Sequence, residues 1–232
     1  DFDGSAGDTP DPTKWTFDVG RGDNGWGNEE LQYYTDLPEN ASLDGEGNLV
    51  ITARRGNSAG REFTSARLKT QGLFEQTYGR FEARVKTPYG PGIWPAFWLL
   101  GSDIEGEQWP QIGEIDVMEL RGQEPGKIAG SAHGPGYSAG SAITTEYELE
   151  NGRFDNEYHI FAIEWGEDYI DYFVDDFVYQ RITPDDVTGE WVFDHNFYMI
   201  LNVAVGGTYV GFPTTQTPFP QTMTIDYVKV YQ

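Results

Sequence analysis

Hydrophobic and polar residues alternate with a period of two in several short runs along the chain. Successive side chains of a strand point to opposite faces, so this alternation predicts half-buried β-strands. The runs are rich in β-branched and aromatic residues, and clusters of Gly, Pro, Asn and Asp separate them, which favours turns between strands. The strands expected from these runs are residues 48–53, 79–86, 159–165, 169–174, 198–203 and 223–230.

The segments between these runs predict one hairpin turn, one short helix and two surface loops. Residues 169–179 predict a β-hairpin that turns at residues 175–176. No stretch of ten or more residues shows a helical stripe, and the best candidate for a short helix is residues 183–189. Residues 87–91 and 122–141 are rich in Gly, Pro and Ser, so we expect surface loops there.

Many short strands without a fixed repeat or a low-complexity linker predict an all-β sandwich. We expect these strands to pair antiparallel. All-β folds of 232 residues are often undivided, so we expect one domain over residues 1–232.

The charge balance narrows the possible partners. Asp and Glu number 38 against 15 Lys and Arg, which gives a formal net charge of -23. A surface this acidic repels phosphate backbones and anionic lipids, so neither nucleic acid nor a membrane is an expected partner, and a neutral substrate fits best. The chain has no cysteine, which excludes disulfides and thiol nucleophiles.

The N-terminus and the hydropathy of the chain indicate where in or outside the cell the protein acts. No run approaches the 18 apolar residues of a transmembrane helix. The sequence begins at Asp1 without an initiator Met, as in a processed mature protein or a trimmed one. We therefore expect a secreted protein, and we expect it to be a monomer.

One predicted strand, residues 112–120, carries three carboxylates: Glu114, Asp116 and Glu119. On a regular strand Glu114 and Asp116 share a face, whereas Glu119 would point to the opposite one. A one-residue bulge near residues 117–118 would turn Glu119 back to the face of the other two, and bulges are common beside active sites.

Three neighbouring carboxyls cannot all ionise easily, so at least one pKa should rise and leave a neutral acid beside an ionised nucleophile. Two glutamates on one strand favour the short separation of a retaining glycosidase over the longer one of an inverting enzyme. The bare spacing is weak evidence, because it should arise roughly once by chance in so acidic a chain. Calcium binding is a rival use, although a strand is a poorer calcium cage than a loop.

Aromatic and amide residues flank the carboxylates. Trp94 and Trp98 would share one face of a strand, and Trp109 stands five residues before Glu114. Tryptophan rings match the C–H face of a sugar, and core packing is the alternative for each of them. Asn28, in a glycine-framed loop, could bind sugar hydroxyls or serve only the turn.

His133 follows in a strand-like stretch after the carboxylates. It could orient Asp116 or reach a leaving sugar, and a structural histidine is the alternative. His159 and His195 have no evident partners. A zinc site is not expected, because the chain has neither a pair of histidines at ligand spacing nor any cysteine.

Taken together, these motifs resemble glycoside hydrolase family 16, and within it the laminarinase-type endo-β-1,3-glucanases. The resemblance covers essentially the whole chain. Its most specific part is Gly-Ile-Trp-Pro-Ala-Phe-Trp-Leu-Leu-Gly at residues 92–101. The other matching segments are residues 2–4, 27–35, 79–84, 109–119, 164–165, 201–207 and 225–228.

The resemblance implies a concanavalin-like β-jelly roll of two curved antiparallel sheets with a cleft on the concave face. It implies retaining chemistry through a covalent glycosyl-enzyme intermediate. Glu114 matches the nucleophile, Glu119 the acid/base and Asp116 the carboxylate that assists them. The matching motifs also place Arg84 and Asn202 among the substrate-binding residues.

The family's lichenases have Glu-x-Asp-x-Glu without the extra residue, so the spacing here differs from theirs. Agarases and carrageenases share the bulge. Many members carry a structural calcium ion, and Asp226 matches its side-chain ligand, with backbone carbonyls expected near Gly47 and Asp1.

The function implied is hydrolysis of β-1,3-glucan, with tolerance of mixed 1,3-1,4 glucan as an open point. No catalytic cofactor is expected. One alternative is a β-glucan-binding protein without activity, although such relatives typically lack the glutamates. Another is a hydrolase of a different neutral polysaccharide such as agarose.

Overall fold

The structure is a computed structural model that describes residues 1–102 and 106–232. Its elements are β1 (Thr16–Phe17), η1 (Gly25–Glu29), β2 (Gln32–Tyr34), β3 (Ala41–Leu43), β4 (Leu49–Ser58), β5 (Arg61–Ser65), β6 (Arg67–Lys69), β7 (Gly79–Lys86), β8 (Ile93–Gly101), β9 (Glu114–Glu119), β10 (Lys127–His133), η2 (Ala139–Ser141), β11 (Ile143–Glu148), β12 (His159–Gly166), β13 (Tyr169–Val174), β14 (Phe177–Ile182), β15 (Phe197–Val205) and β16 (Gln221–Tyr231).

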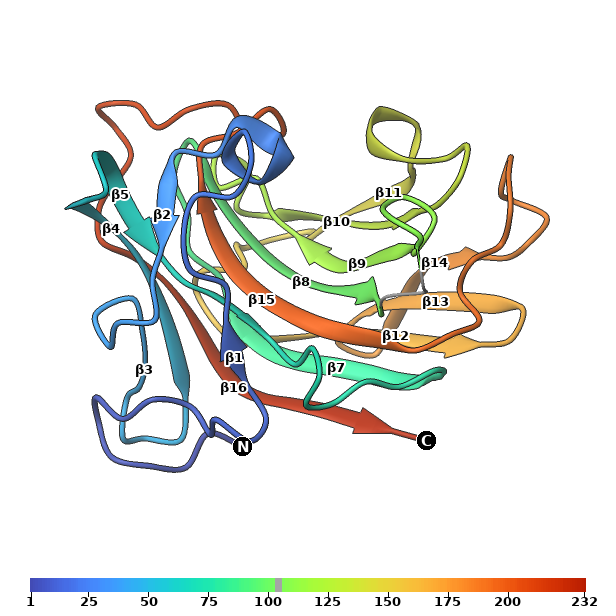
Figure 1. Cartoon of the computed structure of the whole chain (residues 1–232), viewed down its shortest axis with the longest axis horizontal. Helices are drawn as coiled ribbons and strands as arrows, with labels where there is room; N and C mark the ends of the chain where they lie inside the picture. Colours follow the sequence, from blue (N-terminus) through green and yellow to red (C-terminus); the bar gives the residue numbers. More distant parts are fainter. Residues whose placement is uncertain (103–105) are drawn as a thin grey trace.

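These strands form two sheets that pack face to face (Figure 1). The seven-stranded sheet has the order β1-β6-β15-β8-β9-β10-β11. The nine-stranded sheet has the order β14-β13-β12-β7-β16-β4-β5-β2, with β3 paired to β4. The paired strands run antiparallel except β2 and β5, which are parallel. The sandwich predicted from the alternating runs is therefore confirmed.

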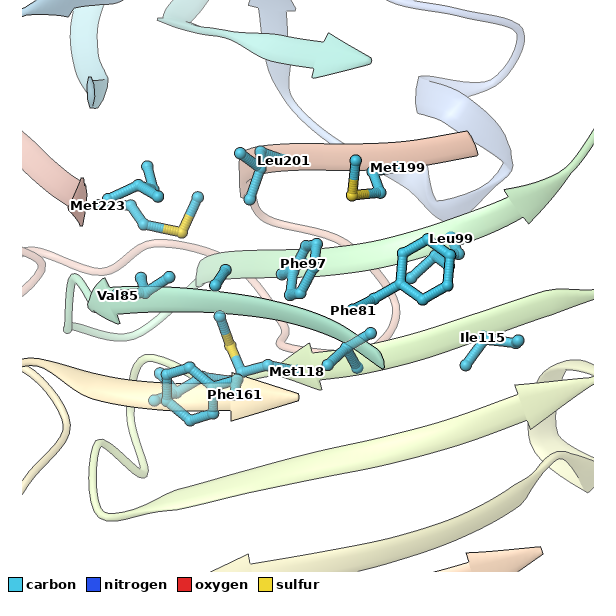
Figure 2. Close-up of a cluster of buried hydrophobic side chains, with 14 of the residues drawn as sticks. Phe81, Val85, Phe97, Leu99, Ile115, Met118, Phe161, Met199, Leu201 and Met223 are labelled. Atoms are coloured by element: carbon cyan, nitrogen blue, oxygen red, sulfur yellow. The ribbon is translucent and has the colours of Figure 1, made fainter. Parts of the chain in front are cut away.

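The core lies between the two sheets (Figure 2). Phe97 of β8 and Met118 of β9 come from the seven-stranded sheet, and Phe81 of β7 and Phe161 of β12 come from the other. All four side chains are fully buried. Burial of apolar surface of this kind is the main favourable contribution to folding. It also fixes which side chains of β8 and β9 remain on the outer face of their sheet.

Each of the six strands expected from the alternating runs is present, and so is the hairpin formed by β13 and β14. The helix expected at residues 183–189 is wrong. The Asp186 carboxylate accepts hydrogen bonds from the backbone N–H and the hydroxyl of Thr183, at 2.8 and 2.7 Å. These bonds close an isolated turn in place of a first helical turn. No helix in the described ranges is both long and apolar enough to cross a membrane.

The loop expected at residues 122–141 is also wrong in part, because it contains strand β10, which pairs with β9 and the edge strand β11 in the seven-stranded sheet. Packing against the other sheet explains the small residues of β10. A Cβ atom at Gly130 would lie 2.2 Å from the hydroxyl of Tyr179 and 2.6 Å from the ring of Tyr172. A glycine inside a strand thus marks the close approach of aromatic rings from the other sheet.

Candidate active site

A cleft of about 1440 Å³ lies on the outer face of the seven-stranded sheet. Strands β8 and β15, which form part of its floor, curve around this face (Figure 1). The cleft brings together nearly every residue that the sequence singled out for substrate or catalysis. These are Asn28, Trp94, Trp98, Trp109, Glu114, Asp116, Glu119, His133 and Asn202.

The bulge expected in β9 is present. Trp98 of β8 pairs with Asp116, and the preceding residue, Phe97, pairs with Met118, so Val117 has no partner in the register. The register with β10 shifts in the same place. Val117 and Met118 are consecutive and both lie in the core, which a regular strand would not allow. The extra residue returns Glu119 to the cleft face.

The three carboxyls of β9 are buried beside one another. Burial, reinforced by the charge of Asp116, raises the pKa of Glu114 to about 8. The same two causes, in the same order, raise the pKa of Glu119 to about 8. Burial also raises the pKa of Asp116 to about 8, against a hydrogen bond with Glu114 that favours its charged form. The row therefore retains protons near neutral pH, because three like charges in a buried site repel one another.

His133, at the end of β10, faces this row. Its Nδ1 accepts a hydrogen bond from the backbone N–H of Ala139 at 3.1 Å. A neutral imidazole whose Nδ1 is an acceptor carries its hydrogen on Nε2. That Nε2 lies 2.9 Å from Asp116 Oδ2 and 3.7 Å from Glu114 Oε1. His133 therefore lies beside the middle carboxylate, as the sequence allowed, although the angles of the close pair do not form a hydrogen bond.

The tryptophans combine apolar faces with polar edges. Trp94 Nε1 donates a hydrogen bond to Glu119 Oε1 at 2.9 Å, which favours the ionised form of that carboxyl. Trp98 Nε1 donates to Asn202 Oδ1 at 2.8 Å. Trp109 is 44% exposed at the cleft, with its ring centre 6.1 Å from that of His133. All three rings line the cleft rather than the core.

Arg84 was expected to bind substrate, and its position in the structure does not support that role. The structure places it outside the cleft, on β7 of the nine-stranded sheet, where its Nη1 donates to Asp226 Oδ2 at 2.6 Å. Its guanidinium also lies over the ring of Tyr158, 4.5 Å from the ring centre. The matching motif at residues 79–84 therefore belongs to the sheet behind the cleft, and Arg84 is not positioned to contact a substrate.

Two groups of residues are relevant to metal ions. One carboxylate oxygen each from Glu114 and Asp116 and one ring nitrogen of His133 lie within 4.8 Å of one another. An ion bound there would occupy the proposed nucleophile. Among the residues expected to bind calcium, Asp226 lies on β16, Gly47 lies in the turn before β4, and Asp1 is the exposed first residue.

The cleft also contains residues that the sequence reasoning missed. Trp26 and Glu30 lie in and beside η1, within a loop that had drawn attention only for Asn28. Arg67, Arg121 and Tyr209 are the other notable additions. No local pattern marks them as site residues. Arg121 follows Glu119 by two residues, whereas Arg67 reaches the cleft because β6 pairs with β15.

The comparisons with known proteins agree with this geometry. A sequence model described as "Glycosyl hydrolases family 16" matches residues 27–229. The beta-glucanase of Rhodothermus marinus is 42% identical over 96% of this chain and 80% of its own length.

Solved structures give the same result for the fold. The laminarinase catalytic domain from Thermotoga maritima MSB8 superposes with a TM-score of 0.92 at 47% identity, over 96% of this chain and 92% of that one. The laminarinase from Rhodothermus marinus superposes with a TM-score of 0.90 at 41% identity, over 100% of this chain and 94% of that one. The expected jelly roll of two curved sheets is thereby confirmed.

Proposed function

This chain belongs to glycosyl hydrolase family 16, and on that premise we propose that it is a retaining endo-hydrolase of β-1,3-glucan. The observation that carries the proposal is the bulged strand β9, which turns Glu114, Asp116 and Glu119 into one cleft. The names of similar proteins, a beta-glucanase and two laminarinases, support the substrate class.

The proposed reaction has two steps. In the first, the Glu114 carboxylate attacks the anomeric carbon, and Glu119 donates its proton to the glycosidic oxygen as that bond breaks. In the second, ionised Glu119 takes a proton from water, whose oxygen attacks the anomeric carbon and releases Glu114. The water supplies the new hydroxyl and restores the proton on Glu119, so the enzyme returns to its starting state.

The electrostatics of the row suit these roles. Burial keeps Glu119 protonated at neutral pH, as a general acid must be. The Trp94 N–H then stabilises the charge that appears on Glu119 once its proton has left. The pKa of Glu114 is also raised to about 8, so the nucleophile is ionised only when its neighbour holds the proton. Asp116, which forms a hydrogen bond with Glu114 and lies near His133 Nε2, is placed to hold it.

The cleft favours a neutral polymer. Among its lining residues within the described ranges, six are acidic and two are arginines, Arg67 and Arg121. Sulfate or uronate groups would therefore meet mostly negative charge. Trp94, Trp98 and Trp109 offer flat apolar faces on which pyranose rings can stack.

Two alternatives keep the fold and change the function. A glucan-binding protein without activity would not need three carboxylates in one row. A hydrolase of agarose would use the same row on a different sugar. Reducing-sugar release from laminarin, lichenan and agarose by the wild type and Glu114→Gln separates these possibilities, with Glu148→Gln as a matched control outside the cleft.

We expect release from laminarin by the wild type and the control, and a loss of several orders of magnitude in Glu114→Gln. Release from agarose alone would indicate the galactan enzyme. Release from no polymer, with retained binding of laminarin, would indicate the binding protein. Release from lichenan beside laminarin would extend the activity to mixed-linkage glucan.

The proposed calcium site depends on Asp226. Its Oδ2 is held by the guanidinium of Arg84, so the residues do not present a formed site for a second cation. A calcium ion at this oxygen would have to displace Arg84. A rise in melting temperature with calcium that Asp226→Asn abolishes would support the site, and an unchanged melting temperature would contradict it.

We propose further that the enzyme acts outside the cell as a monomer. The size of a glucan polymer supports the location, because the polymer must be cut before it can be taken up. Activity in the medium rather than in cell extracts tests the location. Light scattering coupled to gel filtration tests the mass.

A further inference from the structure

Glu30 is a carboxylate at the cleft that the reaction described above does not use. It follows η1 directly, lines the cleft and is only 5% exposed. Burial raises its pKa. A carboxylate in such a position costs folding energy unless other groups hold it, so its contacts define its role.

Glu30 accepts hydrogen bonds from three side chains. Its Oε1 accepts from Asn28 Nδ2 at 3.2 Å, and its Oε2 accepts from Gln32 Nε2 at 2.5 Å and from the Tyr34 hydroxyl at 3.2 Å. Of these three donors only the Tyr34 hydroxyl could instead accept a hydrogen from a protonated carboxyl. The contacts therefore favour the ionised form of Glu30, against the effect of burial.

The contacts continue from Tyr34 to the floor of the cleft. Asn202 Nδ2 donates to the Tyr34 hydroxyl at 3.2 Å, and Asn202 Oδ1 accepts from Trp98 Nε1 at 2.8 Å. Trp98, Asn202, Tyr34 and Glu30 thus form one chain in which each donor points to the next acceptor. The chain ends on a carboxylate, which can only accept, so Glu30 sets its direction.

A cation beside this chain favours the charged form of Glu30. The charge of Arg67 opposes the effect of burial on the pKa of Glu30. The Arg67 guanidinium lies over the rings of both Trp26 and Trp98, 4.5 and 4.8 Å from their centres. Trp98 is therefore held at its ring edge by Asn202 and on its face by Arg67, and its orientation in the cleft depends on both.

We propose that Glu30 is a positioning residue that fixes the Asn28 amide directly and the Trp98 ring through Tyr34 and Asn202. This inference rests on the proposed function, because both positioned groups line the cleft in which the glucan would bind. Glu30 acts through these two groups and does not touch the bond that breaks. Its loss should therefore weaken substrate binding and leave the chemical step nearly intact.

The test uses Glu30→Gln, which keeps the shape of the side chain and turns one acceptor into a donor. Glu29→Gln is the matched control, because Glu29 is the adjacent acid in the sequence and its side chain is exposed. Tyr34→Phe removes only the hydroxyl that links Glu30 to Asn202. Steady-state kinetics on laminarin and melting temperatures are measured for each variant and for the double variant of Glu30 and Tyr34.

We expect Glu30→Gln to raise KM roughly tenfold, the size that follows from one lost hydrogen bond to a charged group, with kcat within about twofold of wild type. Tyr34→Phe should raise KM by less, and the double variant should match Glu30→Gln, because both changes break one chain. Glu29→Gln should behave as wild type.

An unchanged KM in Glu30→Gln, with only a lower melting temperature, would overturn the inference and leave Glu30 a purely structural acid. So would a double variant whose effect on KM is the product of the two single effects. If Glu30→Gln does not fold, Tyr34→Phe decides alone, and an unchanged KM there is equally negative. A wild type without activity on laminarin would instead count against the proposed function.

Discussion

Asp116 and Glu119 face the same cleft although they stand three positions apart along β9. A regular strand would place them on opposite faces. The unpaired residue Val117 resolves the difference, because it adds one position to β9 that neither neighbouring strand matches. The catalytic geometry therefore depends on one local irregularity in an otherwise regular sheet.

This relationship predicts the outcome of deleting Val117. The shortened segment would read Glu-Ile-Asp-Met-Glu, in which a regular strand places all three carboxylates on one face. We expect measurable laminarin hydrolysis to remain, with a loss of stability of about 1.5–3 kcal/mol for the buried valine. Chemical denaturation and reducing-sugar release measure the two effects. Complete loss of activity in a folded variant would contradict this view of the bulge.

The pKa of Glu119 predicts the alkaline limit of activity. The general acid must be protonated, so kcat/KM should fall as the pH rises through about 8. The Trp94 N–H lowers that pKa, and Trp94→Phe removes it. The alkaline limb should then move to higher pH, even if overall activity drops. A limb that stays in place or moves to lower pH would show that Trp94 does not influence Glu119.

The buried carboxyls also predict a pH-dependent gain in stability on mutation. The pKa of Asp116 is raised in the folded state, so the folded protein binds its proton more tightly than the unfolded chain does. Stability from this group is present at low pH and is lost as the pH rises from about 4 to about 8. Asp116→Asn should therefore raise the melting temperature more at pH 8.5 than at pH 5, by a few degrees. Equal shifts at both pH values would argue against a buried, repelled carboxylate.

The placement of Arg84 predicts a near-silent substitution. Because Arg84 binds Asp226 on the sheet behind the cleft, Arg84→Ala should leave the KM for laminarin within about twofold of wild type. Its ion pair is partly exposed, so the cost in stability should not exceed about 1 kcal/mol. Asn28→Ala, within the cleft, serves as the comparison and should raise KM. A large KM effect from Arg84→Ala would restore its expected role in binding.

The sequence predicted the site correctly where the chemically important residues lie on one strand and follow its periodicity. The spacing of Glu114, Asp116 and Glu119 demanded a bulge at residues 117–118, and the structure contains it there. Trp94 and Trp98 were expected on one face, and both line the cleft. In each case the residues lie on one strand, so the period of two and the need for one shared face predict which side chains meet and where the strand must depart from regularity.

The sequence failed where the reason lies in another strand. The small residues of β10 resemble a loop, and only the rings of Tyr172 and Tyr179 explain why Gly130 belongs in a strand. Arg67 reaches the cleft because β6 pairs with β15, where it lies opposite Asn202. Such long-range register has no signature in a single sequence.

The central claim is that Glu114 and Glu119 act on one glucan chain with retention of configuration. Proton NMR of the reducing end formed in the first minutes of laminarin hydrolysis tests it directly. The double displacement predicts that the β-anomer appears first and only later mutarotates to the α-anomer. Initial release of the α-anomer would show single displacement and would contradict the assignment of Glu114 as the nucleophile.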